Sequence, residues 1–544
     1  MSRRPHARHA AMPIVVLVLT LLVGCLGPTS TGVPSPLPAP AATARVLPTA
    51  TVVPPTPAGT PSPTETPVPP AATPPPPLPT PTALDAPGAV AGQIILPDEH
   101  IFASGTPAMD LFFENVATEE VVVVSLPAEQ SVYTTTLPAG SYYAYAWTPG
   151  LAEKGSFTAC RPDELCEDHA LLPITVTVGG KVTGVDITDW VAPESASLVL
   201  AGTLIDGTGA GPLADAALVI REERIVAVGA RGEVQVPVDA RVIEWSEATL
   251  LPGFINAHVH NTQTARNRRS WARGGVTTVR DLGAPVDLPG CFDIRDRFNL
   301  DPENARALAA GPLVTVPGGY PTGQFPSLTV TSLEDARQKI DGLIDGGADV
   351  IKITLESGAG PILSPGEAAA IVETAHARGI PVSVHVTRLP DLERALDAGV
   401  DDIAHMVAGR VPDAVIQRMV AAGVVWVPTL EPFHGRDSGN LRRFIDVGGL
   451  VAMGNDSGYI QGLVIGMPMP EIRQMHAAGM TPLEIIVAST CNAAYVCGRA
   501  STLGTLEVGK FADVLVVGGD PLQDLEVLEN VRLVVHSGVI IREE

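Results

Sequence analysis

Apolar and polar positions repeat with different periods in different parts of the chain. Between residues 251 and 500, short β-branched runs are separated by stretches such as "LEDARQKIDGLIDGG", in which apolar residues return every three or four positions. Strands that alternate with amphipathic helices are typical of βα units, and about 250 residues is the usual size of a (β/α)8 barrel. The pattern therefore predicts a TIM barrel over residues 251–500. Its candidate strands are Phe254–Val259, Val276–Arg280, Leu313–Val316, Val350–Thr354, Val382–Val386, Asp402–Met406, Val424–Thr429 and Leu450–Asn455.

The regions on either side of this barrel have a strand-and-turn pattern. Residues 89–193 contain short β-branched or aromatic runs such as "EEVVVVSL" and "GSYYAYAWT", separated by Gly, Pro and Asp turns, which predicts an all-β sandwich domain. Residues 194–250 and 501–544 have the same pattern of short β-branched runs separated by turn residues. We expect these two segments to pair with one another into one small composite β-sandwich.

The N-terminal 88 residues have a composition that does not predict a globular fold. Residues 1–25 combine a basic start with an apolar stretch and end in "LVGC", which resembles the bacterial lipobox. That resemblance implies cleavage before Cys25 and a lipid on its sulfur. Residues 26–88 are rich in Pro and Thr and cannot bury a core, so they are either a stalk or a disordered leader. We therefore expect an exported protein, lipid-anchored at the cell membrane or cell surface.

Charge and cysteine usage narrow the classes of partner. The formal net charge is −24 and the pI is near 4.8, which disfavours nucleic acid as a partner because phosphate binding needs a basic surface. Cys160 and Cys166 lie close together in the polar stretch "TACRPDELCED". In an exported protein this spacing favours a disulfide; a metal site is the alternative, but no third ligand is nearby in sequence. Cys291, Cys491 and Cys497 follow no metal-binding spacing.

Polar residues that can bind metals occur at the ends of several predicted barrel strands. "FINAHVH" ends the first strand, and the period of two in a strand places His258 and His260 on the same side. Each such residue alone has a structural explanation, such as a buried core histidine or a turn-starting aspartate. The carboxyl ends of barrel strands meet at one mouth, however, where catalysis takes place. The residues brought together in this way are His258, His260, Lys352, His385, His405 and Asp456.

The motifs "LPGFINAHVH", "GVTTVRDLG", "GADVIKI", "VSVHV", "DIAH" and "GNDSG" together resemble the metal-dependent amidohydrolase superfamily, in its imidazolonepropionase-related and prolidase-like branch. The resemblance covers residues 196–544. It implies a barrel with a split β-sandwich, and an enzyme that uses two divalent metal ions of the zinc type. His258, His260 and Asp456 would hold one ion, and His385 and His405 the other. Lys352, carboxylated by CO₂, would bridge them.

The chemistry explains why these residue types are needed. Imidazoles and carboxylates suit zinc-like ions, whereas a lysine ammonium would repel them, so Lys352 fits only as a neutral amine or a carbamate. Two such ions about 3.5–4 Å apart lower the pKa of a shared water toward about 7. The resulting hydroxide would attack a carbonyl carbon of a small-molecule substrate, and Asp456 would carry the proton to the leaving group.

Details of the loops narrow the reaction class. Deaminases of this superfamily have a Glu three residues after the strand-five His, where this chain has Arg388, which disfavours a deaminase. We therefore expect hydrolysis of a carbon–nitrogen bond in a small amide, dipeptide or cyclic amide, with Tyr320 and His434 as substrate contacts. A lactone or ester hydrolase is the alternative within the superfamily. A non-catalytic, ligand-binding surface lipoprotein is the alternative from another class. The sequence gives no oligomeric state.

Overall fold

The computed structural model describes residues 86–96, 107–147, 154–160, 169–191, 197–284 and 290–544. The predicted signal segment, Cys25, nearly all of the predicted linker and Cys166 lie outside these ranges, so what was inferred about them stays a prediction. Within the described ranges, none of the helices is both long and apolar enough to cross a membrane.

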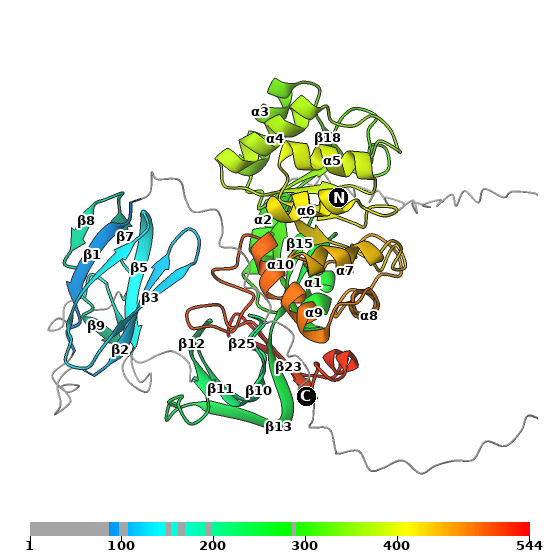
Figure 1. Cartoon of the computed structure of the whole chain (residues 1–544). Helices are drawn as coiled ribbons and strands as arrows, with labels where there is room; N and C mark the ends of the chain where they lie inside the picture. Colours follow the sequence, from blue (N-terminus) through cyan, green and yellow to red (C-terminus); the bar gives the residue numbers. More distant parts are fainter. Residues whose placement is uncertain (1–85, 97–106, 148–153, 161–168, 192–196, 285–289) are drawn as a thin grey trace, which may run out of the picture. The chain divides into compact units, whose positions relative to one another are not determined.

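The first described region is built of strands alone. Two sheets carry it, a 3-stranded sheet in the order β4-β1-β8 and a 6-stranded sheet in the order β3-β2-β5-β6-β9, with β7 paired to β5 (Figure 1). Alternate residues of the central strands, among them Leu111 and Phe113 of β2, enter one buried apolar cluster. The strands are β1 (Gly88–Gln93), β2 (Met109–Asn115), β3 (Val121–Leu126), β4 (Val132–Leu137), β5 (Gly140–Trp147), β6 (Lys154–Ser156), β7 (Ile174–Val176), β8 (Lys181–Thr183) and β9 (Asp189–Val191).

A further, seven-stranded sheet joins two segments that are far apart in the sequence. Its seven strands run in the order β12-β11-β10-β13-β23-β24-β25, so the green and red strands of Figure 1 lie in one layer. The junction is antiparallel, with Ala248 opposite Gly518 and Pro252 opposite Val514. The strands are β10 (Leu198–Leu204), β11 (Leu213–Arg221), β12 (Arg224–Ala230), β13 (Arg241–Pro252), β23 (Val514–Gly518), β24 (Val531–His536) and β25 (Val539–Glu543).

The region between these two segments is α/β, with parallel strands. β14 pairs with β15 and β15 with β16, and a longer ladder runs in the order β18-β17-β19-β20-β21-β22. The strands are β14 (Phe254–Val259), β15 (Val276–Asp281), β16 (Arg306–Ala309), β17 (Leu313–Thr315), β18 (Ser327–Thr329), β19 (Ile351–Thr354), β20 (Val382–His385), β21 (Asp402–Ala404) and β22 (Val425–Val427).

Helices follow most of these strands, and local sequence sets where several begin. Ser364 accepts a hydrogen bond from the backbone N–H of Glu367 while the Glu367 carboxylate accepts one from Ser364, a reciprocal cap that starts α4. The helices are α1 (Ala265–Arg273), α2 (Cys291–Asn299), α3 (Leu333–Asp345), α4 (Pro365–Ala377), α5 (Leu389–Ala398), α6 (Asp413–Ala421), α7 (Gly439–Asp446), α8 (Met469–Ala477), α9 (Pro482–Ser489), α10 (Cys491–Val496) and the 3₁₀ helix η3 (Leu525–Glu529).

The third predicted strand differs from the observed one. The sequence predicts Leu313–Val316, but the chain is already extended at β16, which pairs with β15, and it resumes at β17, which pairs with β19 through Val314 and Ile353. Between the two pieces lie Gly311 and Pro312. Proline lacks the N–H that a continuous ladder needs, and Gly311 has a φ of 71°, so the strand is interrupted there.

The eighth predicted strand, Leu450–Asn455, is an extended segment rather than a regular strand. It is held on one side by a bridge from Trp426 to Val451 and on the other by a bridge from Val259 to Ser457. The backbone N–H of Ala257 also donates to the Met453 carbonyl at 2.8 Å. The segment therefore links β22 to β14.

Alternation along these strands separates two environments. Ile351 and Ile353 of β19 and Val384 of β20 belong to the large apolar cluster that also contains helix residues such as Ile371 and Leu392. Because successive side chains of a strand point to opposite faces, Lys352 points away from this cluster. Lys352 is nevertheless only 1% exposed, so it is buried on the other face of these strands.

Candidate metal centre

The strand ends bring the predicted residues together in one place. His258 lies in β14 and His385 ends β20, while His405 follows β21 directly and Asp456 follows the extended eighth segment. His405 and Asp456 have positive φ values of 75° and 57°, a conformation that is unusual for residues with a side chain and turns each one out of its strand direction. Positive φ at two residues of one small group is typical of functional sites.

Distances confirm that these side chains form one group. The Oδ1 atom of Asp456 lies 3.0 Å from Nε2 of His260 and 3.3 Å from Nε2 of His258. The ring centroids of His258 and His405 are 5.1 Å apart, and those of His385 and His405 are 4.4 Å apart. One potential ligand atom from each of His258, His405 and Asp456 lies within 4.8 Å of the others. The structure thus brings all four predicted imidazoles and Asp456 together.

Lys352 reaches the same interior through a buried chain of polar groups. Its Nζ donates to the Ser383 hydroxyl at 3.3 Å, and this hydroxyl donates to Asp402 at 2.7 Å. Asp402 in turn forms a buried ion pair with Arg280, at 2.9 Å. Burial lowers the pKa of Lys352 to about 7, although the negative charge of Asp402 acts to raise it. A large fraction of the molecules therefore carry Lys352 as an uncharged amine near pH 7.

The imidazoles differ in their electrostatics. Burial, together with the charge of Lys352, lowers the pKa of His385 to about 3, and burial lowers the pKa values of His258 and His405 well below 6.5. Burial acts on His260 in the same direction, but hydrogen bonds to Asp281 and Asp456 outweigh it and raise the pKa of His260 to about 9. Three of the four rings are therefore neutral at pH 7, the form that binds a metal.

These donors fit a divalent ion of the zinc type. Neutral imidazole nitrogens and one carboxylate are the ligands that zinc takes in proteins. Nε2 of His258 and Nε2 of His260 both face the same carboxylate oxygen of Asp456, so three ligand atoms converge on one point where such an ion fits.

Further polar groups, which were not predicted from the sequence, form hydrogen bonds that support these strand ends. Nδ1 of His405 and the Thr429 hydroxyl are 2.8 Å apart. In addition, the side-chain amide of Asn256 donates to Asn455 at 2.7 Å, and the amide of Asn455 donates to the buried Glu431 carboxylate at 2.9 Å. Asn455 directly precedes Asp456, so this network fixes the backbone from which Asp456 projects.

The two predicted substrate contacts are placed differently. The Tyr320 ring lies beside the His385 ring, with centroids 4.8 Å apart. His434 is exposed, and within the described part of the chain its side chain makes neither a ring contact nor a hydrogen bond, whereas the ring centroid of its neighbour Phe433 lies 5.6 Å from that of His405. Glu356 was not predicted from the sequence, and its Oε2 atom lies 3.8 Å from Nε2 of His385.

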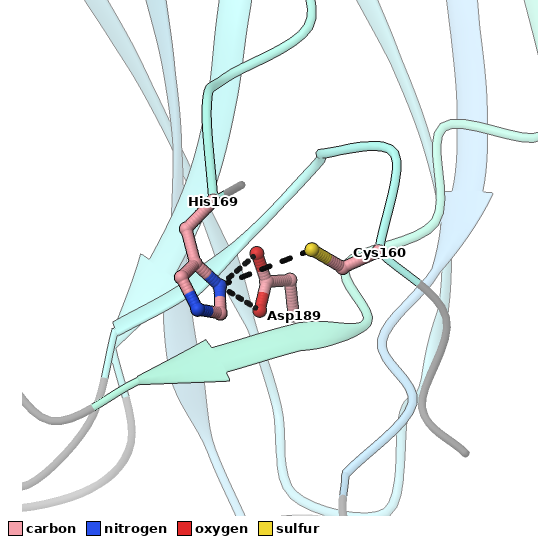
Figure 2. Close-up of side chains that lie close together, drawn as sticks. All are labelled: Cys160, His169 and Asp189. Atoms are coloured by element: carbon pink, nitrogen blue, oxygen red, sulfur yellow. Dashed lines mark hydrogen bonds and ion pairs between the residues drawn. The ribbon is translucent and has the colours of Figure 1, made fainter. Parts of the chain in front are cut away.

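A second group of possible metal ligands lies in the N-terminal β region. Figure 2 shows His169 and Asp189 facing one another beside Cys160. Nδ1 of His169 lies 2.9 and 3.0 Å from the two carboxylate oxygens of Asp189 and 3.9 Å from the Cys160 sulfur. Cys160 is disulfide-bonded, so its sulfur is not a free thiolate. Because Cys166 lies outside the described residues, the Cys160–Cys166 pairing stays a prediction.

Comparison with known proteins agrees with this geometry. The amidohydrolase family model matches residues 249–541. The imidazolonepropionase of Symbiobacterium thermophilum is 29% identical over 365 residues, which cover 55% of this chain and 83% of that protein. The ochratoxinase of Aspergillus niger is 26% identical over 418 residues, which cover 62% of this chain and 85% of that protein.

Solved structures show the same type of fold. The crystal structure of an Xaa-Pro dipeptidase with bound methionine in its active site is similar with a TM-score of 0.57 and 24% identity. The match covers 64% of this chain and 100% of that one. The α/β region is therefore of the TIM-barrel type.

Proposed function

The chain belongs to the amidohydrolase family and is a hydrolase of carbon–nitrogen bonds, and we propose that it cleaves a small amide, dipeptide or cyclic amide at a centre of two divalent metal ions. The observation that carries the proposal is the convergence of four imidazoles, Asp456 and the buried Lys352 at the ends of parallel strands. We also propose that these strands, with the extended eighth segment, close into a (β/α)8 barrel, and that the seven-stranded sheet is the split β-sandwich of the family.

We propose the division of ligands between the two ions that the family resemblance implies. His258, His260 and Asp456 would hold the first ion, since both imidazoles already lie within 3.3 Å of Asp456. His385 and His405, whose ring centroids are 4.4 Å apart, would hold the second, and the carbamate that CO₂ would form with the neutral amine of Lys352 would supply oxygen ligands. Bound there, divalent ions of the zinc type would lower the pKa of water toward neutrality and polarise the carbonyl of the substrate.

The chain's own groups would then move protons and orient the substrate. Asp456 would accept a proton at one carboxylate oxygen and deliver it to the leaving nitrogen, because a positioned carboxylate is a suitable general acid–base group. Tyr320, beside His385, would orient the carbonyl oxygen of the substrate. The Asn256–Asn455–Glu431 network would keep Asp456 in place during both steps.

We further propose that the enzyme is exported and anchored by a lipid on Cys25, with the Pro- and Thr-rich segment as its stalk. The composition of residues 1–88 supports this proposal. A disulfide at Cys160 is consistent with an oxidising compartment.

A hydrolysis screen tests the proposed reaction. The full chain, loaded with Zn²⁺, is assayed against dipeptides, N-acyl amino acids, cyclic amides and lactones, before and after a chelator and again after Zn²⁺ is returned. We expect turnover of at least one carbon–nitrogen substrate, its loss with chelation and its recovery with metal. Turnover that survives complete metal removal would contradict the proposal, and turnover of lactones alone would replace it with an ester hydrolase.

A further inference from the structure

The mouth of the candidate metal centre has two chemically different sides. On the side of His260 lie two aromatic rings, Phe325 and Tyr459, each with its centroid 5.8 Å from the His260 ring and 5.1 Å from one another. Tyr459 and its neighbour Ile460 are 42% and 45% exposed, and residues 322–327 line a surface pocket there. An exposed aromatic pair beside a pocket offers an apolar surface to a ligand.

The opposite side, at His385, carries an acid. Glu356 follows β19, and its Oε2 atom lies 3.8 Å from Nε2 of His385. The Glu356 side chain is 13% exposed, so it is largely withdrawn from water. Its Oε2 accepts a hydrogen bond from the Thr387 hydroxyl, while none of the described residues donates a hydrogen bond to Oε1.

Glu356 has no cationic partner of its own in the described part of the chain. Among the described residues, neither a lysine nor an arginine forms an ion pair with it, and the rings of both His385 and Tyr320 lie near its carboxylate. The guanidinium of the exposed Arg388 lies close by without forming an ion pair: a Cβ on Gly358 would meet both Nη1 of Arg388, at 2.5 Å, and Oε1 of Glu356, at 3.0 Å. A largely buried carboxylate that the protein does not pair is costly unless a ligand supplies the opposite charge.

We propose that Glu356 and the Phe325–Tyr459 pair determine specificity, so that the substrate carries a positively charged group on the His385 side and an apolar or aromatic group on the His260 side. This inference rests on the proposed function, since it concerns the substrate of that same centre. It narrows the small amide to one whose ammonium or guanidinium group donates to Oε1 of Glu356 while a ring packs against Phe325 and Tyr459.

A matched pair of probes isolates the charge. Glycyl-L-phenylalanine and N-acetyl-L-phenylalanine have the same amide and the same ring, but only the first has an ammonium group on the acyl side. We expect the Zn²⁺-loaded wild type to favour the glycyl compound by about tenfold in kcat/KM, the gain typical of one charge-assisted hydrogen bond. Glu356→Gln keeps the shape and removes the charge, so this preference should disappear. Glu373→Gln removes the same charge from an exposed site on α4 and should leave the preference intact.

A binding measurement separates failure of this inference from failure of the proposed reaction. The two probes are titrated by calorimetry into Zn²⁺-loaded Asp456→Asn and into Asp456→Asn/Glu356→Gln. We expect about tenfold tighter binding of the glycyl probe to the first variant and equal binding to the second. Phe325→Ala should weaken both probes equally, because it affects only the ring. Equal affinities of both probes for the single variant, or a preference that survives Glu356→Gln, would overturn the role of Glu356 whether or not the wild type hydrolyses either compound.

Discussion

Two groups of side chains in the described part of the chain have the spacing of a metal site, and they differ in burial and in the donors around them. His258, His405 and Asp456 lie at the ends of parallel strands, and each is buried. Cys160, His169 and Asp189 lie in the N-terminal β region, where the His169 side chain is 46% exposed. The first group is surrounded by further donors, namely His260, His385 and Lys352.

The difference shows that distance alone does not make a metal site. A cysteine binds a metal as its thiolate, and the sulfur of Cys160 is bonded in a disulfide and so is not a thiolate. At the strand ends, burial holds three imidazoles in the neutral form, and a layer of asparagines and carboxylates fixes the backbone beneath them. Metal sites of enzymes depend on such supporting contacts nearly as much as on their ligands.

The largest effect should come from the carboxylate of the first group. Asp456→Asn removes both a metal ligand and the proposed proton carrier, so we expect kcat/KM to fall by about 10³-fold or more while the far-ultraviolet circular dichroism is unchanged. Asp189→Asn is the matched change in the second group and should leave kcat/KM within about twofold. Comparable losses in both variants would remove the distinction between the groups.

Lys352→Met tests the bridging role of the buried lysine. Methionine fits the space without a charge, and we expect the chain to lose about one of its two ions, because the second ion would have only two imidazoles left. Zinc content after gel filtration measures this. Lys339→Met, on the partly exposed surface of α3, is the control and should keep the full content. A Lys352→Met protein with unchanged zinc content and activity would exclude the carbamate.

Asn455→Ala probes the supporting network rather than the ligands. It removes the amide that joins Asn256 to Glu431, so we expect the dissociation constant for Zn²⁺ to rise by about 10–100-fold, as for other residues that orient metal ligands. Competition with a fluorescent chelator gives this value. Asn530→Ala, in the exposed turn before β24, controls for a general loss of stability. Unaltered Zn²⁺ affinity in the Asn455 variant would mean that the network is only structural.

The smallest effect belongs to the second group. His169→Ala breaks a partly exposed contact with Asp189, and such pairs contribute about 0–1 kcal/mol to the free energy of unfolding. We therefore expect at most a small decrease in Tm by calorimetry, with kcat/KM and zinc content as in the wild type. A clear fall in zinc content would identify Cys160, His169 and Asp189 as a real metal site.

Much of the candidate site could be predicted because strand geometry constrains it. His258, Lys352, His385, His405 and Asp456 each stand at or near the end of a hydrophobic run, and parallel strands of a barrel end on one side. Period-two alternation likewise predicted that His258 and His260 would lie on the same side of their strand, where both contact Asp456. These inferences need only local patterns and one rule of topology.

The remainder depends on contacts that no local pattern encodes. Asn256 and Asn455 are 199 residues apart, and each looks like an ordinary polar residue in its own segment. β16 was missed because "RALA" is too short to show a period, and Glu356 was missed because it lies beyond the strand that carries Lys352. His434 was predicted as a substrate contact, but its positive φ of 53° belongs to a turn in which the neighbouring Phe433 contacts His405.

The most direct test of the account counts metal ions in three proteins. Wild type, His258→Asn and His169→Asn are purified after equilibration with Zn²⁺, and the zinc per chain is measured by plasma mass spectrometry. The account predicts about two ions in the wild type and in His169→Asn, and a loss of at least one ion in His258→Asn. A wild type without bound zinc, or zinc that is lost with His169 and retained without His258, would contradict it.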